Sequence, residues 1–242
     1  DISGFHVVAA YPEGTRDIPQ GLEIRAGVEP ELVSMGVEMV DSIRELVSRV
    51  DVVLLETIDG RPHLAQALPV LAAGKPVFID KPFAGSLADG IAIAELAQHF
   101  GTPVFSSSSL RYNASAQSIA GGSIGRVLSA EAFGPAVREP HHPDLFWYGI
   151  HGVENLYTVM GTGCRTVARV NAEPGRDVVV GTWDDGRTGT YRAADDFGGT
   201  AHGTAGESPT GPWGGYRPLL VAVFDFFRTE KPPVPVDETL EI

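Results

Sequence analysis

The sequence lacks the features that mark disulfide-stabilised, nucleic-acid-binding and membrane-spanning proteins. Its single cysteine, Cys164, excludes an internal disulfide bond and a cysteine metal cluster. Only 18 Lys and Arg face 31 Asp and Glu, and the net charge of −13 argues against a nucleic-acid or anionic-membrane partner. No apolar run approaches the ~18 residues that span a bilayer. We therefore expect a small-molecule partner, no nucleic acid, no membrane and a cytoplasmic location.

The first hundred residues alternate short apolar runs with helical stretches. The pairs Ser42/Glu45 and Ser86/Asp89 predict helix starts. The apolar runs predict buried parallel strands at 5–11, 37–40, 50–55, 76–79 and 103–106. This alternation predicts a doubly wound α/β domain, in which the strand-to-helix loops gather at one edge of the sheet and bind ligands there.

Four loops are expected at that edge: residues 11–14, those after Val40, 56–63 and 80–85. Lys81 lies in the last of them, directly after a predicted buried strand. Helix N-termini favour an anionic ligand at such a position. The alternative is structural, with Asp80 capping the turn, Pro82 shaping it and Lys81 in water.

Residues 52–85, VVLLETIDGRPHLAQALPVLAAGKPVFIDKPFAG, resemble the Gfo/Idh/MocA family of NAD(P)-dependent oxidoreductases. The family's acid-Lys-Pro signature is usually EKP and reads DKP here. The match to the family's pattern extends over about 60 residues and includes His63, Gly74, Lys75 and the downstream Arg111-Tyr112. The resemblance implies a Rossmann domain that binds NAD or NADP, with Lys81 between the nicotinamide and a substrate hydroxyl.

The expected cofactor residues come from three loops and the resemblance. They are Pro12, Glu13, Glu56, Thr57, Asp59, His63, Asp80, Lys81 and Pro82. Glu13 favours NAD only weakly, so NAD against NADP stays open. The glycine loop GxGxxG is missing, because residues 121–125 precede a strand and are interpreted as a turn. We expect that about 25 to 30 residues of strand, loop and helix precede residue 1.

The second half predicts an α+β domain with an open, mostly antiparallel sheet. Strands are expected at 126–134, 164–172, 177–183 and 187–194, with a hairpin at Asp185-Gly186 and a helix at 145–160. A late helix at 216–228 is expected to place Leu220, Phe224 and Phe227 on one stripe. The boundary is expected near 107–113, giving domains 1–108 and 109–242. The resemblance implies a homodimer or homotetramer formed through this sheet.

The helix at 145–160 carries the second candidate catalytic residue, His151. Glu154, Asn155 and Thr158 share its face. A lone helical histidine is usually structural, but the resemblance implies that His151 is the acid/base and, with Lys81, completes the catalytic pair. An imidazole with a pKa near ~6.5 can accept a hydroxyl proton as hydride leaves.

The expected substrate residues are Arg111, Tyr112, Asp144, Trp147 and His151. Trp147 stands where many family members have an aspartate, and it either stacks on a sugar or packs in the core. Asp144 could replace that aspartate if the helix starts early. A metal site made of residues 141–144 and His151 is disfavoured, because adjacent histidines rarely converge on one ion.

Two functions are consistent with these residues. The first is a nicotinamide-dependent dehydrogenase acting on CH–OH groups of a sugar, polyol or related carbohydrate derivative. The second is a family member without net redox turnover, either a ligand-binding or sensing protein or an NAD-assisted glycoside lyase or hydrolase. Trp147 and the missing glycine loop favour the second, whereas Lys81, His63, Arg111 and His151 favour the first.

Overall fold

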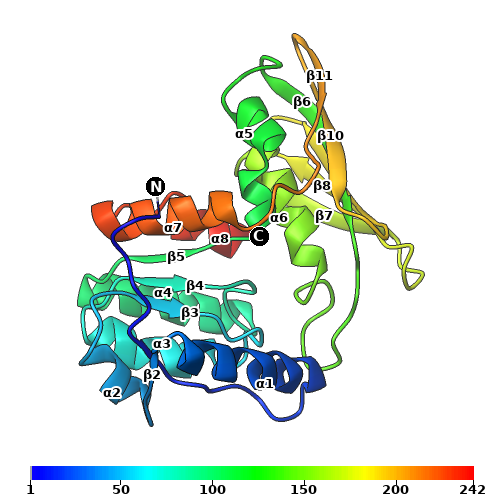
Figure 1. The fold of residues 1–242 in the computed structure, drawn as a ribbon. Coiled ribbons are helices and arrows are strands. Elements are labelled where there is room, and N and C mark those ends of the chain that lie inside the picture. Colours follow the sequence, from blue (N-terminus) through cyan, green and yellow to red (C-terminus); the bar gives the residue numbers. More distant parts are fainter. Residues whose placement is uncertain (1) are drawn as a thin grey trace. The chain divides into compact units, whose positions relative to one another are not determined.

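The computed structural model describes residues 2–242, which form two compact units (Figure 1). The first unit runs to Ser106 and also includes Val221–Leu240, whereas the second comprises Ser107–Leu220 with the last two residues. The division at Ser106 is close to the expected boundary. Residues 221–240 differ from the expectation, because they belong to the first unit.

The first unit contains all five expected strands, each shorter than its apolar run. Strand β1 (Ala9–Ala10) pairs in parallel with β2 (Glu38–Met39). A second parallel sheet has the order β3 (Val53–Leu55), β4 (Val77–Ile79) and β5 (Val104–Ser106). Leu55 lies opposite Ile79, so the residues that follow these two strands are neighbours at the carboxyl edge.

Two helices of this unit begin where Ser42 and Ser86 predict them, and three further helices accompany the strands. They are α1 (Pro19–Ser34), α2 (Ile43–Val47), α3 (His63–Ala72), α4 (Leu87–Phe100) and α8 (Val236–Glu241). The Oγ of Ser42 accepts the Glu45 N–H at 3.1 Å, and that of Ser86 accepts the Asp89 N–H at 3.1 Å. Helix α4 ends at Gly101, whose φ of +64° favours glycine. No helix among residues 2–242 is long and apolar enough to cross a membrane.

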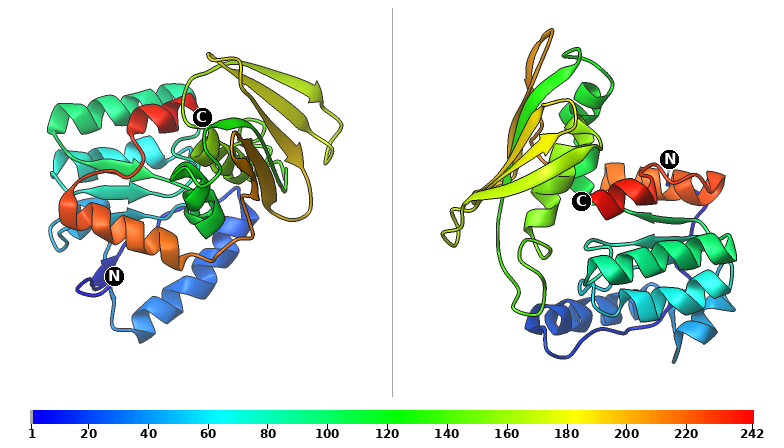
Figure 2. Two further views of the ribbon diagram at one scale, coloured as in Figure 1. Left: turned by 90° about the horizontal axis from the view of Figure 1, so that it is seen from above. Right: turned by 180° about the vertical axis from the view of Figure 1, so that it is seen from behind.

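Helix α7 (Arg217–Thr229) lies beside β5 (Figures 1 and 2). The ring of Phe226 packs on that of Phe105 with 5.6 Å between centroids. The buried stripe comprises Leu219, Val223, Phe226 and Phe227. Of the expected stripe, Phe227 is buried, whereas Leu220 and Phe224 are half-buried, and the ring of Phe224 lies 6.5 Å from that of Phe227. This packing explains why the helix returns to the first unit.

The second unit is built on a sheet of order β11-β10-β6-β9-β8-β7. The strands are β6 (Val127–Gly134), β7 (Cys164–Asn171), β8 (Val178–Trp183), β9 (Thr188–Ala193), β10 (Gly198–Gly203) and β11 (Gly206–Pro209). The ladders are antiparallel except β6 with β9. The open, mostly antiparallel sheet is therefore confirmed.

Three helical segments accompany this sheet: the 3₁₀ helix η1 (Ser109–Tyr112), α5 (Ala114–Ala120) and α6 (Gly149–Met160). Helix α6 packs its apolar face on the sheet, where Leu156 and Met160 join Trp183 in one core. Gly152 allows the close approach, because a Cβ there would lie 2.6 Å from the ring of Tyr191. The helix presents its other face, with His151, away from this core.

Candidate functional site

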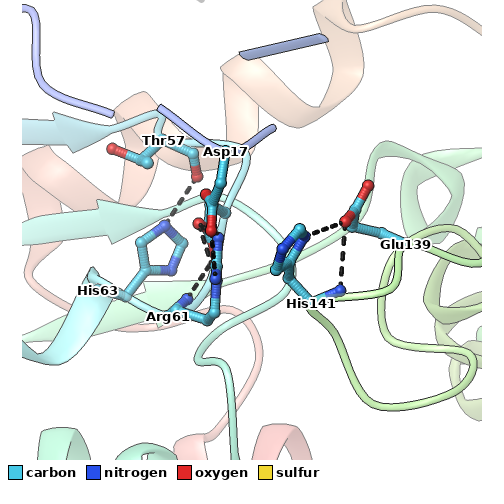
Figure 3. Close-up of polar contacts among 7 residues, drawn as sticks. Asp17, Thr57, Arg61, His63, Glu139 and His141 are labelled. Atoms are coloured by element: carbon cyan, nitrogen blue, oxygen red, sulfur yellow. Dashed lines mark hydrogen bonds and ion pairs between the residues drawn. The ribbon is translucent and has the colours of Figure 1, made fainter. Parts of the chain in front are cut away.

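Three of the four expected loops meet at the carboxyl edge of the first unit. Asp17, just past the first loop, pairs with Arg61, whose Nη2 lies 2.7 Å from Asp17 Oδ1 (Figure 3). The expected cofactor residue Glu13 accepts a hydrogen bond from Gln66 of α3 at 3.3 Å, and Pro12 beside it is half-buried. The loop that follows β1 is thus attached to residues 59–66.

His63 joins the 56–63 loop to the 80–85 loop. Its ring is fully buried, and Nε2 lies 2.8 Å from the carbonyl oxygen of Thr57 (Figure 3). Nδ1 lies 3.2 Å from the carbonyl oxygen of Phe83. Burial lowers the pKa of His63, and hydrogen bonds to backbone carbonyls oppose this only in part. His63 therefore supports the loops from within, and a direct cofactor contact by its ring stays a prediction.

Asp59 is held by protein groups. Its carboxylate is 1% exposed and accepts hydrogen bonds from the N–H and guanidinium of Arg61 at 2.7 to 3.1 Å. Burial alone would raise the pKa of Asp59, but hydrogen bonds from Arg61 and Thr15 outweigh burial and lower it. Asp59 thus orders the loop as an ionised acceptor.

Gly60 and Gly85 let the two loops touch. A Cβ on Gly60 would lie 2.7 Å from the backbone of Ala84, and one on Gly85 would lie 2.8 Å from the Cα of Arg61. These contacts are to backbone atoms, which cannot move aside easily. Close packing therefore fixes the position of Asp80, Lys81 and Pro82 relative to the 56–63 loop.

Glu56, Asp80 and Lys81 lie at the ends of β3 and β4. The N–H of Asp80 donates to the carbonyl of Leu55 at 2.9 Å, so Glu56 and Asp80 follow the strands in register. Burial, and then the charge of Asp80, raise the pKa of Glu56 to about 8, although its side chain keeps an exposed face. Because that face is in contact with water, solvent screening weakens the repulsion between the two carboxylates. Two carboxyl groups and one lysine thus share this edge, and Lys81 is half-buried.

The second unit contains a separate polar cluster on α6. Glu154 Oε2 accepts hydrogen bonds from Arg111 Nε at 2.6 Å and from the Ser108 N–H at 2.8 Å. The side chains of Arg111 and Glu154 are only 5% and 7% exposed. The structural partner of Arg111 is Glu154, and a substrate contact by Arg111 stays a prediction.

His151 belongs to the same cluster through Ser108. Ser108 Oγ lies 2.7 Å from Nδ1 of His151, and the rings of Tyr148 and Phe197 flank the imidazole at 5.5 Å each. Glu154 was noted on the sequence because it shares a helical face with His151. The sequence analysis missed Ser108, because 43 residues separate it from His151 and nothing distinguishes it from the other serines of residues 106–109.

The remaining expected substrate residues have protein partners. Trp147 is 5% exposed and packs on His142 with 4.9 Å between ring centroids, which agrees with the core-packing alternative. Asp144 lies five residues before α6 and pairs with Arg169, so the helix does not start early enough to include it. Tyr112 is half-buried at the end of η1.

His141 and His142 have different surroundings. His141 Nδ1 lies 2.6 Å from Glu139 Oε1 (Figure 3), whereas His142 is buried against Trp147. Across the described residues 2–242, no three His, Cys, Asp or Glu side chains are grouped to hold a metal ion.

Comparisons with known proteins agree with this architecture. Residues 23–107 match the oxidoreductase family with an NAD-binding Rossmann fold, GFO_IDH_MocA. The resemblance to the Gfo/Idh/MocA oxidoreductases is therefore confirmed on the first unit. An inositol 2-dehydrogenase of Gluconacetobacter diazotrophicus is 45% identical over 56 residues, which are 23% of this chain and 17% of that enzyme's length.

Solved structures extend the similarity of fold to nearly the whole chain. The WlbA dehydrogenase of Bordetella pertussis, crystallised with NADH and UDP-GlcNAcA, has a TM-score of 0.70 at 17% identity, covering 94% of this chain and 83% of that one. An aldose-aldose oxidoreductase of Caulobacter crescentus, complexed with glycerol, has a TM-score of 0.70 at 16% identity, covering 98% and 86%. The expected fold class is thereby confirmed.

Proposed function

We propose that this protein transfers a hydride between NAD or NADP and a carbinol of a sugar, polyol or related carbohydrate derivative. The observation that carries the proposal is the position of Lys81, half-buried at the carboxyl end of β4 among loops locked together by His63 and Arg61. In an open α/β sheet this edge is where ligands bind. The matched family is an NAD-binding one, and the relatives named above act on or bind polyols and sugars.

The residues at this edge fit the nicotinamide end of a dinucleotide. The carboxylates of Asp80 and, when ionised, Glu56 would complement the positive charge of an oxidised nicotinamide ring. Thr57 and Pro82 would line the space beside that ring. When bound, the dinucleotide supplies the hydride acceptor or donor.

Lys81 and His151 would address one substrate oxygen. A cationic Lys81 would stabilise negative charge that develops on that oxygen, since such charge stabilisation lowers the barrier most. His151 would form a second polar contact with the substrate oxygen.

A second candidate function lacks net redox turnover. The buried Trp147, where many relatives have an aspartate, favours it, because the charge that would support an imidazolium at His151 is missing. In that case the protein would bind cofactor or ligand as a sensor, or use held NAD transiently to cleave a glycoside.

One screen distinguishes these functions. The protein is incubated with NAD or NADP and a panel of sugars, polyols and aryl glycosides. Net formation of reduced nicotinamide, followed by absorbance, supports the dehydrogenase. Release of the aryl group without net reduction supports the glycoside-cleaving alternative, and neither signal with intact cofactor binding supports a sensing role.

A further inference from the structure

Ser108 holds the ring of His151 through a short hydrogen bond within the second unit. Its Oγ lies 2.7 Å from Nδ1 of His151, and Ser108 is only 1% exposed, so water has little access to the serine hydroxyl. The backbone of Ser108 is fixed on both sides. Its N–H donates to Glu154 at 2.8 Å, and its carbonyl accepts the N–H of Arg111 at 3.3 Å. The hydroxyl is therefore held in place against α6.

The direction of this hydrogen bond follows from the partners of the hydroxyl. Within residues 2–242, Ser108 Oγ has two hydrogen-bonding neighbours: the N–H of Leu110 at 3.2 Å and Nδ1 of His151. The N–H of Leu110 can only donate, so the serine oxygen accepts there. The hydroxyl hydrogen then needs an acceptor, and the lone pair of Nδ1 is the one within reach. Which ring nitrogen carries the proton is thus assigned from the network.

We propose that Ser108 is a positioning residue that donates to Nδ1 and holds neutral His151 in the tautomer with its proton on Nε2. The opposite tautomer would direct the Nδ1 hydrogen at Ser108 and leave the buried hydroxyl hydrogen without an acceptor. The penalty for an unsatisfied buried donor corresponds to a population ratio of about tenfold or more against that tautomer. The nearby charges of Glu154 and Arg111 are directed at each other, 2.6 Å apart.

This assignment changes the role of His151, and that consequence rests on the proposed function. A base needs a lone pair on the nitrogen that faces the substrate, but Nε2 in this tautomer carries a hydrogen. Neutral His151 would therefore donate a hydrogen bond to the substrate oxygen and stabilise its negative charge. Of the two proposed catalytic residues, Lys81 would be left to exchange the proton. Its neutral amine would accept the hydroxyl proton during oxidation, and the resulting cation would stabilise the charge that remains on the oxygen.

Nitrogen NMR tests the tautomer without any substrate. Long-range proton–nitrogen correlation spectra of ¹⁵N-labelled protein are recorded at a pH where histidines are neutral, and loss of one ring pattern in His151→Gln assigns His151. We expect a protonated Nε2 and an unprotonated Nδ1. A protonated Nδ1, or an even mixture of tautomers, would overturn the proposal.

Two variants of Ser108 distinguish the effect of its hydroxyl from the effect of side-chain packing. Ser108→Thr keeps a hydroxyl and is expected to keep the wild-type pattern. Ser108→Ala removes the donor, and the two nitrogen shifts are expected to move towards each other as the second tautomer gains population. Ser115→Ala, whose hydroxyl donates to Gly211 at 2.9 Å in the same unit, is the matched control and should leave His151 unchanged. An unchanged pattern in Ser108→Ala would contradict the role of Ser108.

A turnover comparison then tests the consequence. The amide nitrogen of Gln stands where Nε2 does and can donate but cannot act as a base. We expect His151→Gln to retain at least about tenfold more turnover than His151→Ala, the scale of one hydrogen bond. Equal loss in both variants, with the tautomer confirmed, would reject the donor role at the proposed site and leave the tautomer assignment standing.

Discussion

The buried pair of Arg111 and Glu154 offers a sharp test, because it decides between a structural and a substrate-binding arginine. Glu154 Oε2 accepts the guanidinium at 2.6 Å and the Ser108 N–H at 2.8 Å, and both side chains of the pair are more than nine-tenths buried. Arg111→Met would leave the Glu154 carboxylate in the interior without its cation. Removal of one partner of a buried pair costs about 3 to 5 kcal/mol of stability.

Substitutions of Glu154 show how much of that stability loss comes from the unpaired charge. Glu154→Gln keeps an oxygen that can accept from Ser108, so we expect a smaller loss, about 1 to 3 kcal/mol. The double variant Arg111→Met/Glu154→Leu removes both charges and leaves the Ser108 N–H without its carboxylate acceptor. It should be at least about 2 kcal/mol more stable than the summed losses of the single variants Arg111→Met and Glu154→Leu predict.

Urea unfolding followed by tryptophan fluorescence measures these effects. The three tryptophans, Trp147, Trp183 and Trp213, all lie in the second unit, so the signal reports on the unit that contains the pair. Two results would refute the reasoning. One is a loss below about 1 kcal/mol for Arg111→Met, and the other is single-variant effects that add within about 0.5 kcal/mol. An Arg111→Met variant with wild-type stability but lost ligand binding would assign the arginine to the substrate.

Three further predictions follow from the charges, the loops and the sheet. The raised pKa of Glu56 means that the stability contributed by its protonated form is present below the ordinary pKa of 4.5 and is lost as pH rises above it. Glu56→Gln should therefore raise Tm increasingly as pH rises above 4.5, and a Tm difference that is constant with pH would contradict this. The lowered pKa of His63 gives the opposite pH dependence. The stability that neutral His63 contributes is present above the ordinary pKa of 6.5 and is lost as pH falls below it, by at most about 1.4 kcal/mol per pH unit. If His63→Gln had the same slope of stability against pH as the wild type, this prediction would be wrong. Strand β7 leaves Val167 and Val170 70% and 65% exposed, so we expect a homodimer or homotetramer through this sheet, and a monomer by light scattering would reject it.

Local signals predicted strands β1 to β9 and helices α2, α4, α6 and α7, whereas α1 and α5 were not predicted. Apolar runs bounded by turn residues predicted the strands of the first unit, and Ser42 and Ser86 marked helix starts because capping depends on neighbours three residues apart. Strand lengths were overestimated, since an apolar run does not reveal where ladder pairing stops. The return of residues 221–240 to the first unit depends on a contact between Phe105 and Phe226, which no local pattern encodes.

The candidate site was predicted less completely than the fold. Lys81, His63 and His151 were found because the resemblance and their positions after strands or on a helix mark them. The partners that define their chemistry come from distant segments. Ser108 contacts His151, and Glu154 accepts a hydrogen bond from Arg111, although more than 40 residues of sequence separate the members of each pair. The burial of side chains could not be predicted either, because the sequence was consistent with Trp147 either stacking on a sugar or packing in the core.

The most direct test of the central claim compares wild-type protein with Lys81→Met, using a substrate found by the screen. Isothermal titration first measures the affinity for NAD and NADP, and the formation of reduced nicotinamide then measures turnover at saturating cofactor. We predict that Lys81→Met keeps its fold and most of its cofactor affinity but loses turnover by about 10² or more, the scale for losing a charge stabiliser or general base. Undiminished turnover in Lys81→Met would contradict the account and leave Asp80-Lys81-Pro82 as a structural turn.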